Sequence, residues 1–588
     1  MFEDAENFAD IFRGGLPYLL IALPLFFICS ANPVLASSEF SVQRMSQFDV
    51  NGVAYGCRAS ALSLEAKSLY TWSTGRHCVV AKLQELTIEQ FRDIRQKAGG
   101  LVILLPKNVS AMSLEEKQHL YLLEQAMLAQ PNSIPIYFSA YNAELERIIT
   151  DITRTTRDNE AGKAQRSSAA SELFATISAN GYQVIVSGAS HLASKNSKIP
   201  IIQGELTSSS KILKQGEVGL ESGNKQPLII VTAHLNTFGL YHDYPLNADA
   251  AVLMTLADLF SKMHNTPNAM PKYRLLFLLT ESGTLLNFQG IKKWLDENVQ
   301  LQEDIVSITG TLIALKKPNN IKKENVDFVL CLDTITQSLN ADIGNLYMHV
   351  SKPPKEGTAM NDFFKLLKTL AELHGNVTVD GVHKKINLAD QQLAWEHERF
   401  SMKRLPAFTI SALKSPKEPV RFTIFKDSDE QLIEQTQQHA KIIAESLAHY
   451  VYGIQEPNEI FADTLQISKK LIKSYLYLKS ALHNNDLKNA FEKYLKNVKI
   501  IYDKPDTRDP DFLFYDGKEA RLNVYHVKPA VFDLFLTILI CAYLATVYFI
   551  IQYFPAIYDT VCKMTKTQAP QTLNNSHSTS NNTKSKIN

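Results

Sequence analysis

The chain contains little cysteine, with six cysteines among 588 residues. Three of them lie in or beside the two long apolar segments, which leaves Cys57, Cys78 and Cys331 in the predicted globular body. That number is too small for the disulfide framework that stabilises many small secreted domains. A bridge between Cys57 and Cys78 and two separate thiols are both compatible with the sequence. Cys331 lies inside the apolar run 328–332, which predicts a buried free thiol.

An excess of charge of either sign is missing as well, because the formal net charge is +1 at pH 7. The sequence lacks the basic surplus that is typical of nucleic-acid-binding proteins, and it has no acidic tail. Internal repeats are absent too. Hydrophobic residues make up 45% of the chain and charged residues 21%, which is the composition of a globular protein with a large core. At roughly 150 residues per domain, the length predicts two to four domains.

Long apolar runs are restricted to two places, and the first lies near the N-terminus. Residues 14–38 carry no charge, and the strongest stretch, 16–29, is shorter than the roughly 20 residues of a helical membrane span. Small residues at 34–36 resemble a cleavage site, so we expect residues 1–36 to be a signal peptide. The flank before this stretch is acidic, where a signal peptide usually has a basic one. The sequence is therefore also compatible with an uncleaved signal anchor.

The second apolar run lies near the C-terminus, where residues 534–558 contain no charged side chain. This length predicts a transmembrane helix over residues 530–556. Residues 563–588 are rich in Ser, Thr and Asn, and we expect them to be disordered. With the signal at the N-terminus, the sequence predicts a single-pass type I membrane protein of the secretory pathway. Its body lies in the lumen, and its short tail lies in the cytosol.

Between these segments, apolar strand-like runs alternate with helical patterns. Continuous apolar strands predict a doubly wound, mainly parallel α/β sheet with helices on both faces. Residues 455–529 differ, because Lys-rich and Tyr-rich stretches there have a helical period. The predicted parts are an N-terminal α/β domain at 37–150, a larger α/β domain at 165–454 and a membrane-proximal helical region at 455–529.

Four polar residues of the larger domain follow predicted strands or open a helix: His234, Asp249, Glu281 and Asp333. In open parallel sheets, ligand sites form at the carboxyl ends of the strands. One histidine and three carboxylates at such an edge are ligands suited to zinc or to hard divalent metals. Taken singly, Asp249 is compatible with a helix N-cap and His234 with a satisfied buried imidazole.

The order of these four residues resembles the two-metal zinc aminopeptidases of the M28-type fold, and the resemblance covers roughly residues 165–454. Four positions match the family's metal ligands, and the departures concern catalysis. Asn236 stands where the family has the Asp that orients the first His. Thr280 stands where the family has the Glu that acts as general base, and a hydroxyl cannot take a proton from water near neutral pH. The family's final His is absent from residues 421–429.

Six further segments resemble the nicalin family, the nicastrin-like proteins of the endoplasmic reticulum membrane. They are spread over almost the whole chain: EFSVQRM at 39–45, HVSKPP at 349–354, VHKKINLA at 382–389, WEHERF at 395–400, RLPAF at 404–408 and YHVKPAVFDL at 525–534. The resemblance implies a non-catalytic, peptidase-like protein. It has no catalytic residue, no bound metal and no other cofactor, and the four matching positions are vestigial.

The same resemblance implies partners. Nicalins act with the large lumenal protein nodal modulator and with a small polytopic membrane subunit. That complex joins the ribosome-bound translocon and assists the biogenesis of multi-pass membrane proteins, so contact with nucleic acid is not direct. Two alternatives remain open. One is an active membrane-bound zinc aminopeptidase, and the other is a receptor subunit that binds carbohydrate or peptide in the vestigial pocket.

The predicted topology can be tested through N-glycosylation. Asn108 and Asn376 begin Asn-x-Ser/Thr motifs in the predicted lumenal body, whereas Asn574 and Asn581 begin such motifs in the predicted cytosolic tail. We expect an N-glycan hydrolase to shift the wild-type protein on a gel, and a double Asn108→Gln, Asn376→Gln variant to migrate without that shift. Glycan on the tail together with a bare body would contradict the proposed orientation.

Overall fold

The computed structural model describes most of the chain. The described residues are 38–163, 181–188, 190–195, 197–206, 226–235, 238–241, 247–266, 270–300, 305–308, 311–314, 321–322, 325–336, 345–375, 377–425, 430–476, 485–527 and 530–566. The predicted signal peptide, the tail beyond residue 566, Asn236 and Asn376 lie outside these ranges. The chain divides into two compact units. One comprises Ser37–Thr156 with Tyr182–Tyr525, and the other comprises Met1–Ala36, Arg157–Gly181 and His526–Asn588.

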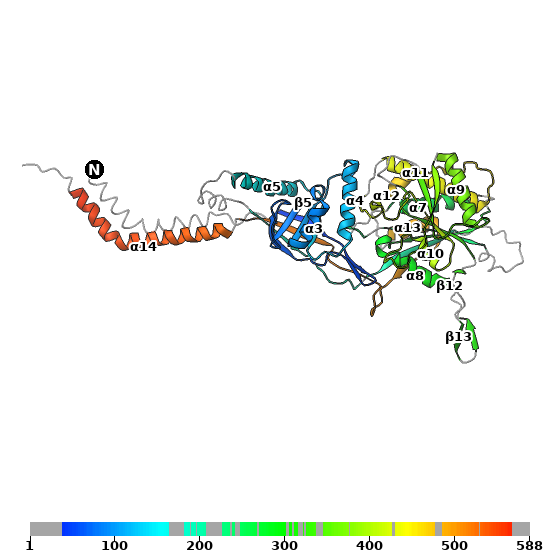
Figure 1. The fold of residues 1–588 in the computed structure, drawn as a ribbon, viewed down its shortest axis with the longest axis horizontal. Helices are drawn as coiled ribbons and strands as arrows, with labels where there is room; N and C mark the ends of the chain where they lie inside the picture. The colour runs from blue at the N-terminus through cyan, green and yellow to red at the C-terminus, as the bar shows by residue number, and fades with distance from the viewer. Residues whose placement is uncertain are drawn as a thin grey trace, which may run out of the picture. The chain divides into compact units, whose positions relative to one another are not determined.

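The first sheet of the body is a closed barrel (Figure 1). In spatial order its strands are β1 (Ser38–Arg44), β22 (Glu519–Val527), β8 (Gly181–Ser187), β4 (Leu62–Lys67), β5 (His77–Lys82), β6 (Gly100–Leu104) and β7 (Ile136–Ser139). Strands β4 to β7 are parallel neighbours. They are connected through α3 (Ile88–Lys97) and α4 (Leu114–Leu128), and α5 (Ala143–Lys163) follows β7.

Local sequence explains where the connecting helices begin. Thr87 and Ser113 are N-caps, and each side-chain oxygen accepts a hydrogen bond from the backbone amide three residues later. The residues at those positions, Gln90 and Glu116, return a bond to the cap's own amide. This reciprocal arrangement is a capping box, which satisfies amides that a helix leaves unpaired at its start. Cys57 and Cys78 are both buried free thiols, so the bridge considered above does not form.

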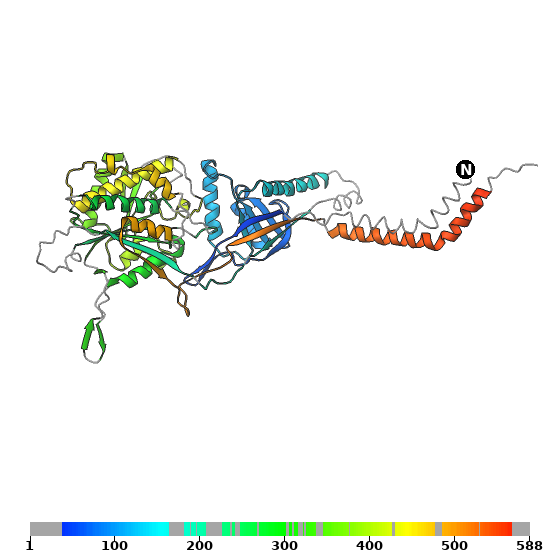
Figure 2. The same cartoon turned by 180° about the vertical axis from the view of Figure 1, so that it is seen from behind.

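The barrel corrects the expected boundaries of the N-terminal domain. Residues 37–150 do not close it, because β8 and β22 complete the ring. β22 pairs antiparallel with β1 from Ser38↔Val524 to Gln43↔Glu519, and Figure 2 shows the orange β22 running along the blue barrel. β8 lies within the larger predicted domain at 165–454, but it belongs to the barrel and not to the larger sheet.

The second sheet has eight strands in the order β18-β17-β19-β16-β10-β11-β9-β20. Their bounds are β18 Thr378–His383, β17 Asn345–Val350, β19 Ala407–Ser411, β16 Val326–Leu332, β10 Leu228–His234, β11 Arg274–Thr280, β9 Ile199–Leu206 and β20 Lys496–Asp503. The four central strands, from β19 to β11, are parallel. β9, β20 and β17 each pair antiparallel with a neighbour. The sheet is therefore mixed, with a parallel centre.

Helices cover both faces of this sheet (Figure 1). Alternate strand residues point to opposite faces, and the apolar clusters follow that period. Ile229 and Val231 pack with the helices of one face, whereas Leu228 and Ile230 pack with those of the other. The first face carries α7 (Ala248–His264), α9 (Ala359–Gly375), α11 (Glu430–Tyr452), α12 (Lys469–Leu476) and α13 (Asn485–Tyr494), and the second carries α8 (Gln289–Asn298) and α10 (His397–Met402).

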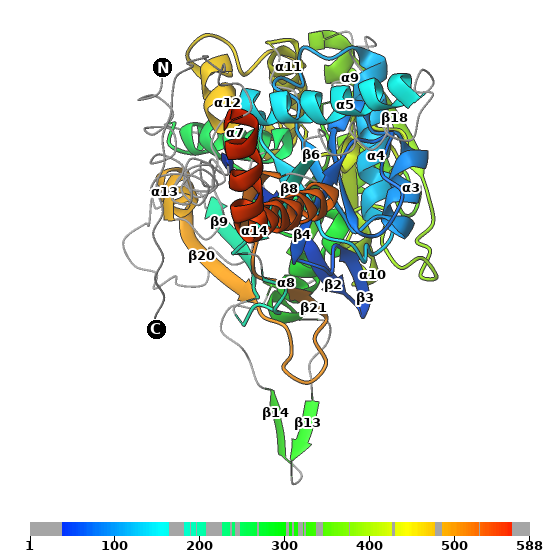
Figure 3. The same cartoon turned by 90° about the vertical axis from the view of Figure 1, so that its left-hand side faces the viewer.

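The region 455–529 is not wholly helical, contrary to expectation, because it also contributes strands. Its two helices, α12 and α13, pack into the core under the large sheet. β20 then extends that sheet beside β9 (Figure 3), and β22 closes the barrel. A small sheet consists of β2 (Gln47–Val50), β3 (Val53–Gly56) and β21 (Phe512–Phe514). Two strand pairs are β12 (Val299–Gln300) with β15 (Ile321–Lys322) and β13 (Ile305–Ile308) with β14 (Thr311–Ala314). The 3-10 turns are η1 (Leu83–Glu85), η3 (Thr284–Leu286), η5 (Pro419–Arg421) and η6 (Asp463–Leu465).

The last helix, α14, covers Ala530–Lys566. Its stretch Leu534–Tyr553 is the one segment of the described chain that is long and apolar enough to cross a membrane. None of its residues is buried within the part of the chain that the structure describes. α14 therefore continues ten residues beyond the predicted end at 556, and the first residues of the expected tail, 563–566, are helical.

The closing strand yields a test of the fold. Leu522 and Val524 are almost fully buried in the barrel, and burial of such a side chain stabilises a protein by roughly 1.5–3 kcal/mol. We expect a secreted body that ends at residue 527 to fold, and one that ends at residue 516 to be retained or to unfold at a lower temperature. Leu522→Ala should lower the melting temperature of the longer body, whereas Arg521→Ala, an exposed neighbour, should leave it unchanged. Equal melting temperatures for both lengths would show that β22 is dispensable.

Candidate functional site

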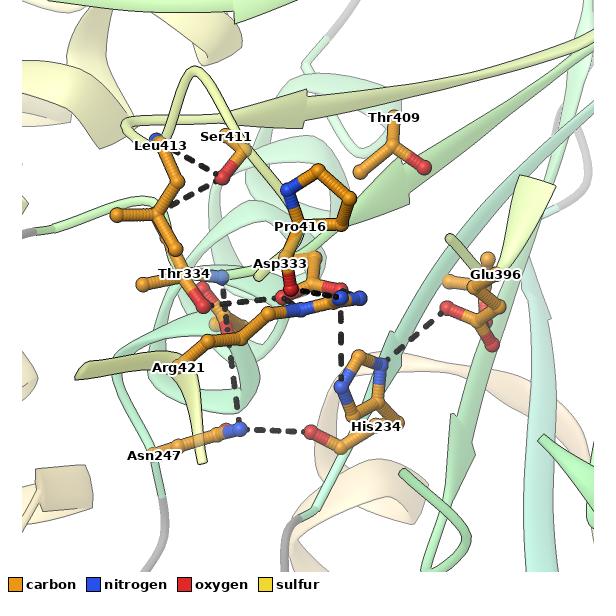
Figure 4. Close-up of polar contacts among 12 residues, drawn as sticks. His234, Asn247, Asp333, Thr334, Glu396, Thr409, Ser411, Leu413, Pro416 and Arg421 are labelled. Atoms are coloured by element: carbon orange, nitrogen blue, oxygen red, sulfur yellow. Dashed lines mark hydrogen bonds and ion pairs between the residues drawn. The ribbon is translucent and has the colours of Figure 1, made fainter. Parts of the chain in front are cut away.

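Three of the predicted site residues meet at the carboxyl edge of the parallel strands. His234 is the last residue of β10, and Thr280 is its partner in register at the end of β11. Asp333 directly follows β16, whose Leu332 pairs with Ala233. By the alternation of the strands, all three point to the face that carries α8 and α10. Figure 4 shows His234 and Asp333 in one cluster with Glu396 and Arg421.

His234 lies between two carboxylates. Its Nε2 is 3.9 Å from Asp333 Oδ2, and its Nδ1 is 3.5 Å from Glu396 Oε2. All three side chains are buried. Burial by itself lowers the pKa of His234, but Asp333, Glu396 and Asp249 outweigh this effect and raise the pKa above its ordinary value. The second oxygen of Glu396 accepts a hydrogen bond from Thr232 Oγ1 at 3.1 Å, so a residue of β10 helps to position this carboxylate.

Arg421, at the end of η5, binds Asp333 with two parallel hydrogen bonds. Its Nη2 donates to Oδ2 at 2.6 Å, and its Nε donates to Oδ1 at 3.2 Å. Burial alone would raise the pKa of Asp333, but the guanidinium and then His234 outweigh burial and lower the pKa to about 2. The remaining Nη1 donates to the carbonyls of Ala394 at 2.7 Å and Pro416 at 3.2 Å. The buried guanidinium is thus neutralised and bonded on each side.

An aromatic stack holds the guanidinium from its flat face. Cζ of Arg421 lies 4.2 Å from the ring centre of Trp395, and this indole also stacks on His349 with ring centres 4.1 Å apart. Stacking of this kind favours arginine, because a planar delocalised cation matches an aromatic face. His349 Nε2 bonds to the carbonyl of Leu413 at 2.8 Å, and burial lowers the pKa of His349 to about 4. The stack therefore contains a neutral imidazole at pH 7.

Asp249 lies beside this cluster, and its carboxylate accepts hydrogen bonds from backbone amides. Its two carboxylate oxygens accept the amides of Thr334 and Ile335, each at 2.8 Å. The N-cap of α7 is Asn247, whose Oδ1 accepts the amide of Ala250 and whose Nδ2 donates to the carbonyl of His234. The N-cap role considered for Asp249 thus belongs to Asn247. Asp249 instead fixes the turn that follows Asp333.

Glu281 does not join the cluster. It lines a separate cavity of about 100 Å³ with Phe514, Tyr515 and Lys518. The side chain of its neighbour Thr280 forms hydrogen bonds within the same loop. Thr280 Oγ1 lies 3.0 Å from Ser282 Oγ and accepts the Ser282 amide at 3.2 Å. A methyl group on Gly290 would lie 2.4 Å from that same hydroxyl. Thr280 is therefore enclosed by its own loop, and Glu281 is directed elsewhere. Asn236 lies outside the described residues.

These contacts do not fit a two-zinc centre. Zinc takes ligands at about 2.0–2.2 Å that converge on one point and must be deprotonated and free to bind. Here Arg421 occupies both oxygens of Asp333, backbone amides occupy both oxygens of Asp249, and Glu281 lines another cavity. Among the described residues, no three His, Cys, Asp or Glu side chains form a group that could hold a metal. The positive charge near Asp333 comes from the protein itself.

The segment that carries Arg421 also contacts the barrel part of the body. The amide of Ile424 donates to Glu124 Oε1 of α4 at 3.0 Å, and the hydroxyl of Tyr121 lies 3.4 Å from the carbonyl of Phe425. Val420, Ile424 and Phe425 belong to an apolar cluster with buried residues of α3 and α4. The ionic cluster therefore lies beneath a packed interface and does not form the floor of an open cleft.

Sequence reasoning missed the three residues that build this cluster, Glu396, Trp395 and Arg421. Two of them lie in the segment WEHERF at 395–400, whose sequence indicates family resemblance but no site. Arg421 opens the stretch 421–429, which lacks the family's final His and supplies a cation instead. A buried carboxylate without a metal requires a nearby positive charge, and this requirement was the available signal.

The Arg421–Asp333 pair can be tested by substitution. Removal of one partner of a buried ion pair leaves an uncompensated charge, which costs roughly 3–5 kcal/mol. We expect Arg421→Met to lower the free energy of unfolding by about that amount, measured by denaturant titration of the secreted body. Arg421→Lys keeps the charge but loses the paired bonds and the stack, so its loss should be smaller. Lys417→Met, at an exposed position of the same loop, is the control and should unfold as wild type.

The sign of the pH dependence follows from the lowered pKa of Asp333. The ordinary pKa of an aspartate is about 3.9, and that of Asp333 in the folded protein is about 2. The stabilisation from the charged form is complete above about pH 4 and is lost as the pH falls toward 2. In Arg421→Met the guanidinium is gone and burial raises the pKa of Asp333, so the variant relieves its unpaired charge by taking up a proton as the pH falls. The difference between wild type and Arg421→Met should therefore be largest near pH 8 and shrink toward low pH, and a difference that grows as the pH falls would contradict the ion pair.

Known proteins resemble this chain over most of its length. No protein-family model matches the chain. The BOS complex subunit ncln of Danio rerio is 34% identical over 97% of this chain and 100% of the relative. The BOS complex subunit NCLN of Homo sapiens is 34% identical over 93% of this chain and 95% of the relative. Nicalin of Caenorhabditis elegans is 25% identical over 93% of this chain and 96% of its own length.

Among solved structures, the gamma-secretase component nicastrin matches 84% of this chain and 100% of its own chain, with a TM-score of 0.53 and 10% sequence identity. At that identity the likeness shows the fold alone. The full-length relatives at 34% identity go further than the fold. On their evidence the chain belongs to the nicalin family.

Proposed function

We propose that this chain is a non-catalytic scaffold subunit of a membrane complex in the endoplasmic reticulum. Its body lies in the lumen, and one helix anchors it in the membrane. The complex associates with the translocon and the ribosome and assists the biogenesis of multi-pass membrane proteins. Its other members are a large lumenal protein of the nodal modulator kind and a small polytopic membrane subunit. Support for the complex comes from relatives of nearly full length that are named BOS complex subunits.

One observation carries the non-catalytic part of the proposal. Arg421 binds Asp333 and is buried under the segment that packs on α4. A hydrolase needs a water molecule, a base and the substrate carbonyl in contact within one cleft. We infer that His234, Asp249, Glu281 and Asp333 are vestigial positions of a lost metal site. The residues that once would have served catalysis now stabilise the fold, so the surface of the body is left for binding.

The experiment is affinity purification of the tagged full chain from detergent extracts, followed by identification of the co-purifying proteins. We expect one large lumenal protein and one small polytopic membrane protein in stoichiometric yield. A matched variant replaces residues 530–556 with an unrelated span of equal length. Because lipid gives no hydrophobic drive for helix association, specific helix contacts must hold a membrane subunit. The variant should therefore lose the small polytopic subunit and keep the lumenal one.

The same purified material tests the enzyme alternative. We expect no turnover of amino-acyl reporter substrates, with or without added zinc, and none after Thr280→Glu. Turnover that a chelator abolishes, and that Asp249→Ala also abolishes, would establish an aminopeptidase and refute the scaffold as the sole function. Recovery of every partner at wild-type yield with the replaced span would reduce the span to a passive anchor.

A further inference from the structure

One of the segments that carry the family resemblance lies largely outside the core. VHKKINLA at 382–389 begins in β18 and continues into the loop that leads to WEHERF at 395–400. WEHERF supplies Trp395 and Phe400 to the core, where both are buried. The residues from 387 to 391 are instead exposed. β18 is the edge strand of the large sheet, so core packing does not account for the loop that follows it.

Hydrogen bonds hold this loop at both ends. At its start, the amide of Lys384 donates to the carbonyl of Val350 at 3.1 Å. Near its end, Asn287 Nδ2 donates to the carbonyl of Gln391 at 3.1 Å, and Asn287 Oδ1 accepts the amide of Leu393 at 2.9 Å. A surface loop that is already held in place loses less conformational freedom when a partner binds.

The held loop exposes an apolar side chain. Leu388 is 76% exposed, and it lies in a short turn in which Asn387 Oδ1 accepts the amide of Ala389 at 3.1 Å. Protein interfaces commonly depend on a few anchor side chains that fill pockets of the partner. Leu388 on its positioned loop has the form of such an anchor.

Four exposed lysines accompany the loop. β17 and β18 are parallel neighbours, with Val350 in register with His383, so both strands end at the same place. The lysines that follow these two strands are Lys352, Lys355, Lys384 and Lys385. None of the four forms an ion pair with a residue that the structure describes. The loops 351–358 and 384–392 contain one carboxylate each, at Glu356 and Asp390, so positive charge is in excess.

We propose that loop 384–390 and these four lysines form the docking surface for the large lumenal subunit of the complex. The matching surface of that subunit is an apolar pocket rimmed by carboxylates. Leu388 fills the pocket, and the lysines pair with the carboxylates, which steers association and fixes orientation. This inference rests on the proposed function and deepens it, because it assigns the contact to one part of the body.

A protein fits this surface better than a membrane does. The negative surface potential of membranes belongs to the cytoplasmic leaflet, whereas the body is proposed to lie in the lumen. Membrane binding also scales with buried apolar area, and one exposed leucine among lysines supplies little of it. The unpaired lysines favour an acidic protein surface, where they gain partners that the chain itself does not offer.

The test uses the tagged full chain in its membranes. A photo-crosslinking amino acid replaces Leu388, and a matched control carries it at Met270, which is 75% exposed. Membranes are irradiated before detergent extraction, and the adducts are identified by mass. A double Lys384→Glu, Lys385→Glu variant is purified beside a double Lys195→Glu, Lys504→Glu variant, which makes the same change of charge at exposed positions elsewhere. Thermal melting of each purified chain checks its fold.

We expect position 388 to form an adduct with the large lumenal protein and position 270 to form none. Lys384→Glu, Lys385→Glu should lower the yield of that protein several-fold and keep the small polytopic subunit, whereas the control pair should retain both. If the first pair melts at a lower temperature, the adduct from position 388 decides alone.

Three outcomes would overturn the proposal. An intact complex without a protein adduct at 388 would place the docking surface elsewhere and leave the scaffold role standing. An adduct at 388 with lipid alone would assign the loop to the membrane surface. Absence of every partner from the wild-type material would refute the proposed function, and this docking surface with it.

Discussion

The ion pair between Arg421 and Asp333 is the contact on which the centre of the body depends. A carboxylate that follows a buried strand cannot stay charged without a nearby cation or strong donors. In a metal-dependent hydrolase the metal ion supplies this charge, and the cleft must remain open to substrate. In this protein the guanidinium supplies it through two bonds, at 2.6 and 3.2 Å. The same electrostatic demand is met without any opening to solvent.

This exchange has a structural consequence beyond the cluster. A metal ion connects only the segments that supply its ligands, whereas Arg421 also brings its own backbone segment to the site. That segment contacts the carbonyls near Trp395 on one side and α4 of the barrel part on the other. Through this ion pair, the segment that packs on α4 is also tied to the end of β16. The pairing of Asp333 and the packing of the two parts of the body over it therefore depend on the same residue.

Sequence patterns predicted the parts of this arrangement that depend on local order. Continuous apolar runs identified β10, β11 and β16, and the polar residues at their ends, because strand direction alone brings those ends to one edge. The partners of these residues come from elsewhere in the sequence. Arg421 is 88 residues from Asp333, and no local period relates the two. The predicted set therefore included Glu281, which is local to β11 but lines another cavity, and it omitted Glu396, which is distant but in contact.

The errors in 455–529 have a similar origin. β20 reads KNVKIIYD, in which lysines and apolar residues also fit a helical face, and only pairing with β9 makes it a strand. β22 shows the better signal, since Ala520, Leu522 and Val524 alternate with exposed or half-buried residues. Its partner β1 lies more than 470 residues away, as the register Ser38↔Val524 records. Non-local pairing of this kind is decided by burial in the finished barrel and not by local preference.

That pairing also determines where the two ends of the body emerge. β1 follows the first apolar segment and β22 precedes α14, and the two strands are antiparallel neighbours with Ser38 opposite Val524. The chain therefore enters the barrel and leaves it at the same end of one strand pair. Six registered residue pairs join these strands, so the strand that leads to α14 is held along its length by its neighbour. A barrel closed by its own last strand thus provides a stiff base for the body, whether or not the N-terminal segment is retained.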